Sequence, residues 1–224
     1  MRCLRWLVVG ALPLLSTLST VGQEQPPPPK RFAEALYPIQ RGYRWEYRVT
    51  DAKAPKVAEA NKKPQQVIVV AESEQTFSLK KKNPQKEWTE EVVGFNLQVE
   101  GGGKILQEQV LVADDGVYRV SGAGKAINPP LRVFKKDARK GTVWECNSQS
   151  ENAQLKGSFV AEEEVVTVPA GMFATVVVRS RDFLVGAQKM QVETWYAPKV
   201  GMVKQHILVG NHDVTLELEK FEAK

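Results

Sequence analysis

The sequence predicts an all-β protein with a single antiparallel, strongly curved sheet that forms an open barrel or a sandwich, after a signal peptide. Three observations support this class. Apolar and polar side chains alternate from Tyr43 onward, turn residues separate short strand-like runs, and no stretch after the first 22 residues keeps an apolar period of 3.6. The missing helical period disfavours parallel βαβ units and the dinucleotide-binding folds built from them.

Residues 1–22 have the organisation of a secretory signal peptide. A basic start is followed by an apolar run over residues 6–18 and by small residues that end at Gly22. The run is shorter than the roughly 20 apolar residues of a membrane-spanning helix, and a glycine and a proline interrupt it. We therefore expect cleavage after Gly22, or alternatively near Ser19, with no transmembrane anchor afterwards. The protein is expected to be exported, to the periplasm or the extracellular space.

The two cysteines predict neither a lipid anchor nor a disulfide. Cys3 precedes the apolar run, whereas the acylated cysteine of a bacterial lipoprotein follows it. Cleavage leaves Cys146 as the one thiol, so the mature chain can form no internal disulfide. We expect Cys146 to be a small, half-buried strand residue, with a reactive or intermolecular thiol as the alternative.

The rest of the chain divides into a proline-rich spacer, residues 23–37, and a single antiparallel β domain, residues 38–222. Four consecutive prolines give the spacer an extended polyproline form. Residues 32–37 are compatible with one helical turn, and the loop 51–64 has no strand pattern. The strand-like runs are 43–49, 66–71, 75–79, 87–100, 105–113, 117–121, 143–149, 155–168, 172–182, 189–196, 202–209 and 212–221.

The last hairpin has a register that the sequence itself tests. A two-residue turn at Gly210-Asn211 pairs Val209 with His212 and Ile207 with Val214, and it extends to Gln205 with Leu216 and Val203 with Leu218. Apolar side chains then share one face, while the pairs His206–Thr215 and Lys204–Glu217 share the other. The same register places the two histidines on partner strands and on opposite faces, which excludes a shared metal ion.

Other residues that could carry chemistry have structural interpretations. Adjacent residues of Glu162-Glu163-Glu164 alternate between faces, so a solvated edge or bulge is favoured over a metal site. Asp114-Asp115-Gly116 predicts a hairpin turn of two or three residues, and Gly101-Gly102-Gly103 predicts a loop. No nucleophile elbow, phosphate-binding loop or zinc-binding helix motif occurs. We therefore expect no enzyme activity, no cofactor and no metal site.

The charge of the chain is modest. The formal net charge of +5 falls to about +3 when Arg2 and Arg5 leave with the signal peptide, and the excess lies in lysine-rich loops. A solvated surface is the favoured interpretation, with a patch for anionic envelope polymers or lipid head groups as the alternative. No basic patch has interleaved aromatic residues, so nucleic acid is not an expected partner.

Tryptophans in strand-like runs are the remaining candidates for a binding site. Trp45, Trp144 and Trp195 are the candidate ligand-lining residues. Large aromatic side chains fill β cores, and they can equally line a lipid-binding concavity in an open barrel.

Three motifs carry a resemblance to known proteins. They are Tyr-Pro-x-x-x-Gly-x-x-Trp-x-Tyr from Tyr37, Val-Pro-Ala-Gly-x-Phe from Val168 and Ala-Pro-x-Val-Gly-x-Val-Lys from Ala197. The combination resembles a group of exported bacterial all-β proteins of unknown function, which look similar to the half-barrels of envelope lipoprotein carriers. The resemblance implies a curved antiparallel sheet that holds an acyl chain, and it brings no catalytic residues.

Together these observations predict a non-enzymatic envelope protein that binds an apolar or amphipathic ligand, with lipid as one possible partner. An interaction module that docks another envelope protein through an edge strand or the lysine loops is the alternative. An enzyme built from scattered carboxylates is the third and least favoured reading.

Overall fold

The computed structural model describes residues 38–52, 65–82, 86–122, 124–151 and 153–223. The predicted signal peptide, the spacer 23–37 and the helical turn at 32–37 lie outside these residues, as does most of the loop 51–64. No helix of the described residues has the length and hydropathy needed to cross a membrane.

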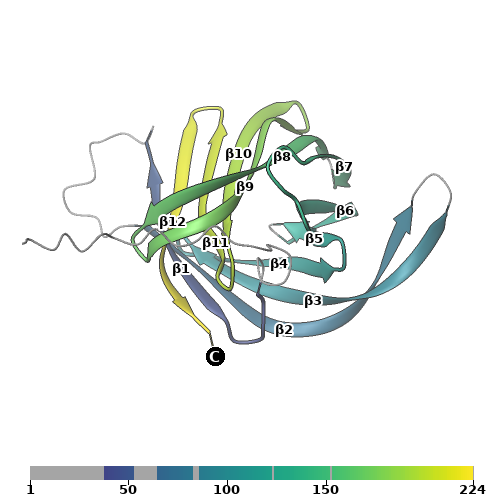
Figure 1. Cartoon of the computed structure of the whole chain (residues 1–224), viewed down its shortest axis with the longest axis horizontal. Coiled ribbons are helices and arrows are strands. Elements are labelled where there is room, and N and C mark those ends of the chain that lie inside the picture. Colours follow the sequence, from purple (N-terminus) through teal and green to yellow (C-terminus); the bar gives the residue numbers. More distant parts are fainter. Residues whose placement is uncertain (1–37, 53–64, 83–85, 123, 152, 224) are drawn as a thin grey trace, which may run out of the picture.

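Twelve antiparallel strands of the described chain form one closed barrel (Figure 1). The predicted all-β class with a single antiparallel sheet is confirmed, and a barrel rather than a sandwich is observed. The barrel is closed rather than open because β1 pairs with both β2 and β12. The strands are β1 Arg44–Asp51, β2 Gln65–Lys82, β3 Glu87–Gly101, β4 Lys104–Ala113, β5 Gly116–Gly122, β6 Lys125–Lys135, β7 Val143–Ser150, β8 Ala153–Val168, β9 Gly171–Val185, β10 Gln188–Ala197, β11 Gly201–Val209 and β12 His212–Glu222.

Two-residue turns set the register of several hairpins. Gly102-Gly103 joins β3 to β4 with φ angles of 56° and 74°, as a type I′ turn requires. Asp114-Asp115 joins β4 to β5, which resolves the choice between two and three residues. Pro169-Ala170 joins β8 to β9.

The predicted register of the last hairpin is confirmed from Val209–His212 to Lys204–Glu217. The predicted pairing of Val203 with Leu218 is wrong, because the β11–β12 ladder ends one pair earlier. A bulge on the β10–β11 side leaves Val203 as an extra residue, and Leu218 pairs with Tyr47 of β1. Both side chains are still fully buried.

The β2–β3 hairpin extends beyond the barrel wall (Figure 1). β1 pairs with β2 over residues 65–70, whereas β2 continues to Lys82 in its ladder with β3. Phe77, Leu79 and Val92 of this extension pack with Leu111 and with other residues of β4 and β5 in a small second core. The main core is a larger cluster of buried residues, drawn mainly from the barrel strands.

The β6–β7 joint, defined here as the boundary between these two strands, has the shortest ladder in the described barrel. It contains two residue pairs, Ile127–Ser150 and Asn128–Gln149, whereas each of the other neighbouring strand pairs has five or more. Pro129 and Pro130 follow directly on β6 and have no N–H group to donate. The indole Nε1 of Trp144 on β7 donates to the carbonyl of Arg132 on β6, at 3.1 Å.

Candidate ligand-binding cavity

The barrel interior contains a cavity of about 230 Å³. Its wall is mainly apolar and includes residues from most of the strands. The volume exceeds the roughly 150 Å³ of a cavity that holds benzene and is below the roughly 300 Å³ at which drug-sized pockets begin. Seven valines make up much of the wall: Val67, Val69, Val99, Val110, Val133, Val178 and Val192.

The number of strands and the size of these side chains explain why the cavity exists. A barrel of about eight strands has an interior that side chains just fill, and this barrel has twelve. Valine is too short to reach the middle of so wide a barrel from its wall. As a result, inward-facing residues such as Val69, Val192 and Ile207 are only half-buried.

Aromatic side chains fill the part of the interior next to the cavity. Phe134 of β6 and Tyr196 of β10 make an edge-to-face contact at 5.2 Å between ring centroids, and it crosses the interior because these strands are not neighbours. Phe159 lies between Trp144 and Phe183, with centroid distances of 5.7 and 5.6 Å. The interior is therefore packed on one side and hollow on the other.

Trp45 lies on the cavity wall and is held rigidly. Its indole Nε1 donates to the carbonyl of Val200 at 2.6 Å, and its ring stacks on Phe221 at 5.5 Å. The hydroxyl of Tyr47, two residues along β1, donates to the carbonyl of Met202 at 2.9 Å. Because these polar atoms are satisfied within the protein, the rings offer the cavity mainly apolar surface.

The other two tryptophans singled out from the sequence do not line the cavity. Trp144 is buried behind Phe159 and spans the β6–β7 joint. Trp195 faces the outside of the barrel, where the cations of Arg179 and Lys204 lie 5.8 and 5.6 Å from its ring centroid. Trp195 pairs with Lys204, so it shares the charged face of the final hairpin.

Two polar pairs interrupt the apolar wall. Arg119 of β5 forms an ion pair with Glu108 of β4, with 3.2 Å between Nη2 and Oε2. The side-chain amide of Gln205 on β11 donates to the hydroxyl of Thr194 on β10, also at 3.2 Å. Among the described residues that line the cavity, Glu108 and Arg119 are the two that carry a charge at neutral pH.

The sequence contains a signal for Glu108. Leu106, Glu108, Val110 and Val112 occupy alternating positions of one strand, so Glu108 is a lone carboxylate on an apolar face. A lone carboxylate at such a position either faces the interior or shows that the assumed alternation of the strand is shifted by one residue. Arg119 occupies the corresponding place between Val117 and Ser121, but its partner could be identified only from the register of β4 with β5.

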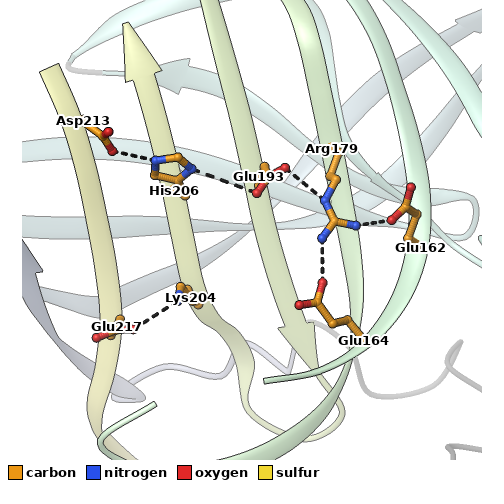
Figure 2. A network of polar contacts seen from close by, with 8 residues as sticks. All are labelled: Glu162, Glu164, Arg179, Glu193, Lys204, His206, Asp213 and Glu217. Carbon is orange, nitrogen blue, oxygen red and sulfur yellow. Dashed lines mark hydrogen bonds and ion pairs between the residues drawn. The ribbon is translucent and has the colours of Figure 1, made fainter. Parts of the chain in front are cut away.

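A second cluster of polar residues lies on the outer face of β8 to β12 (Figure 2). Arg179 of β9 contacts Glu162 and Glu164 of β8 and Glu193 of β10, and its side chain is 15% exposed. Burial alone would lower the pKa of Arg179, but the three carboxylates outweigh it and raise that pKa. The predicted edge or bulge is wrong, because β8 is paired on both sides and its register is regular at these residues. Glu162 and Glu164 remain partly exposed, at 45% and 43%, and alternation places both on one face beside a shared cation.

The same face continues across β11 and β12. His206 lies between Asp213, at 2.7 Å, and Glu193, at 4.0 Å (Figure 2). Lys204 and Arg48 both bind Glu217, at 3.1 and 3.0 Å. Burial tends to raise the pKa of Glu217, but the hydrogen bonds from Arg48 and Lys204 outweigh it and lower that pKa. We interpret this network as an ion-paired outer wall, because its four glutamates contact Arg179, Lys204 or Arg48.

Neither a metal site nor a reactive thiol is found in the described parts of the chain. No group of three or more His, Cys, Asp and Glu residues there could hold a metal ion. Cys146 is buried, its Sγ lies 3.4 Å from the carbonyl of Gly157, and burial raises its pKa to about 11. The thiolate that would react is therefore scarce at neutral pH.

Comparison with known proteins identifies the fold. No protein-family model and no curated protein matches the chain. A crystal structure of a Bacteroides fragilis protein, predicted to be exported and described as having a YmcC-like fold, is similar with a TM-score of 0.51 and 16% identity, over 84% of this chain and 99% of that chain. A predicted lipoprotein from Parabacteroides distasonis matches with a TM-score of 0.46 and 13% identity, over 84% of this chain and 98% of that chain. The first likeness indicates that this chain has the YmcC-like fold.

Proposed function

We propose that this protein is an exported, non-enzymatic binder of an apolar or amphipathic molecule, which it holds inside the barrel. The observation that carries the proposal is the hollow, valine-lined part of the interior beside Trp45. A fully packed interior would serve stability better, since empty space forfeits packing contacts. The signal-like N-terminus and the likeness to a protein predicted to be exported support the location.

The volume favours a single hydrocarbon chain. About 230 Å³ is small for a two-chain lipid, while one short or partly inserted chain fits the size and the apolar wall. Trp45 and Tyr47 belong to the binding surface. Trp144 packs against Phe159, which lines the cavity, and Trp195 is not part of the binding surface.

Native mass spectrometry of the protein purified from its own cell envelope tests the proposal. A retained small molecule of constant mass supports it, and displacement of a bound naphthylamine probe by hydrocarbon chains gives a second measurement. Val192→Phe, which places a larger side chain in the cavity, should weaken probe binding. Leu184→Phe, at an exposed position outside the cavity, is the matched control. Equal binding by both variants would contradict a site inside the barrel.

A second candidate function is docking of another envelope protein. The observation in its favour is the extension of the β2–β3 hairpin, where β2 continues past its ladder with β1 and where Trp88 is 37% exposed. Trp88→Ser should then abolish co-purification of a stoichiometric partner from the envelope. Binding of the probe inside the barrel should not change.

A further inference from the structure

We propose that the ligand is a single-chain amphiphile whose head group is zwitterionic, with its ammonium beside Glu108 and its anionic group beside Arg119. This inference rests on the proposed function and adds the chemical class of the head group. It derives from the charged pair Glu108–Arg119 that the described cavity wall contains rather than from the cavity's size.

The barrel register turns both charged side chains inward. Glu108 pairs with Leu97, which is buried and lines the cavity, and Arg119 pairs with Val110, which does the same. The side chains come from neighbouring strands and meet at 3.2 Å. Their place in the wall is therefore fixed by backbone pairing on both strands.

The pair lies where water reaches the cavity. The Arg119 side chain is 38% exposed and that of Glu108 is 19% exposed. In contrast, the aromatic residues that bound the cavity elsewhere, among them Phe159, Phe183 and Tyr196, are buried. A bound amphiphile would thus keep its head group at the ion pair and place its chain among the valines.

The charges of the wall favour a head group that has both signs and no net charge. Glu108 and Arg119 sum to zero, so the single charge of a singly charged head group at this pair would lie beside a like charge as well as an opposite one. A fatty acid could approach the guanidinium only while its carboxylate also faced Glu108. A zwitterion pairs an anion with the guanidinium and an ammonium with the carboxylate, and both contacts are charge-assisted hydrogen bonds.

Competition between head groups on one chain length tests this inference. The mature protein is loaded with the naphthylamine probe, which is then displaced by four amphiphiles with 12-carbon chains: a lysophosphatidylethanolamine, dodecanoate, dodecylammonium and monododecanoylglycerol. All are used below their micelle-forming concentrations. We expect the lysophosphatidylethanolamine to bind about tenfold more tightly than either singly charged chain. The affinity of the uncharged glycerol ester should lie between that of the lysophosphatidylethanolamine and those of the two singly charged chains.

Charge variants then test the assignment to these two residues. Glu108→Gln makes the wall net positive, so dodecanoate should gain affinity relative to the zwitterion. Arg119→Gln makes it net negative, so dodecylammonium should gain instead. Asp182→Asn removes a carboxylate from an exposed ion pair with Lys189, outside the cavity, and should leave the ranking unchanged.

The outcomes separate this inference from the function on which it rests. Equal affinity for all four chains, or tighter binding of dodecanoate to the unaltered protein, would overturn the head-group assignment while the binding function stands. An unchanged ranking in a folded Glu108→Gln variant would also overturn it. Displacement by none of the four would contradict the binding function itself. The ranking on the unaltered protein decides the question even if a charge variant fails to fold.

Discussion

The wall formed by β9 to β12 and β1 is held together far more extensively than the β6–β7 joint. β1 and β12 share eight residue pairs, and Arg179 and Glu217 link neighbouring strands of that wall through ion pairs. His206 adds polar contacts with Glu193 and Asp213 on the strands beside it. The joint has two residue pairs and one indole hydrogen bond. Closure of a barrel therefore does not imply equal strength all round, and local opening is expected to begin where the ladder is shortest.

Truncation in the strong wall should have the largest effect. Leu218 is fully buried in β12, so Leu218→Ala is expected to lower the free energy of unfolding by about 2–5 kcal/mol. Urea denaturation followed by tryptophan fluorescence measures the change. Leu184→Ala, at a position that is 37% exposed, should cost less than about 1 kcal/mol. Similar losses in the two variants would contradict the packing described here.

Removing the central cation of the same wall should have the next largest effect. Arg179→Met leaves three carboxylates on neighbouring strands without it, and we expect a loss of about 1–3 kcal/mol in the free energy of unfolding. Lys189→Met is the control, because its ion pair with Asp182 is 62% and 73% exposed and should contribute less than about 1 kcal/mol. A loss no larger than that of the control would show that the Arg179 network adds little to the wall.

The sequence predicts the parts of this fold that depend on local pattern. Alternation and turn chemistry were sufficient for most of the strands and for the Ile207–Val214 register. The prediction missed β6, which contains Pro129 and Pro130, and it divided β2 into two separate runs, 66–71 and 75–79. The β10–β11 bulge at Val203 has no local signature, because it arises where β11 is paired with β10 on one side and β12 on the other. Closure of the barrel likewise has no local signature, because it depends on the pairing of β1 with β12, at the two ends of the domain.

The candidate site was harder to predict than the fold, for the same reason. Trp45 belongs to the cavity wall and Trp195 does not, although both are strand tryptophans within two residues of a tyrosine. What separates them is the face they occupy, and a bulge beside Trp195 shifts the register there. Glu108 and Arg119 become a pair only through the β4–β5 ladder, which itself contains a register shift.

At the β6–β7 joint a smaller, localised effect is expected. Trp144→Phe keeps an aromatic ring beside Phe159 but removes the hydrogen bond to the carbonyl of Arg132, at a cost of about 1 kcal/mol. Hydrogen exchange should accelerate in residues 131–135 and 143–148 and stay unchanged in β11 and β12. Uniform acceleration across the barrel would mean that the joint does not open separately.

The smallest effect concerns pH and belongs to the strong wall. The pKa of Glu217 is lowered in the folded protein, chiefly through hydrogen bonds from Arg48 and Lys204 that outweigh the effect of burial. Its contribution to stability is therefore fully present above the pKa of the unfolded chain and is lost as the pH falls through the lower, folded value. Since these side chains are partly exposed, we expect a contribution below about 1 kcal/mol. Glu217→Gln should remove this part of the acid dependence of the denaturation midpoint, whereas Glu145→Gln, at an exposed position of β7, should leave it intact. An acid limb that is identical in the Glu217→Gln variant and the unaltered protein would mean that the outer wall does not depend on this carboxylate, and the contrast with the β6–β7 joint would then rest on the backbone ladders alone.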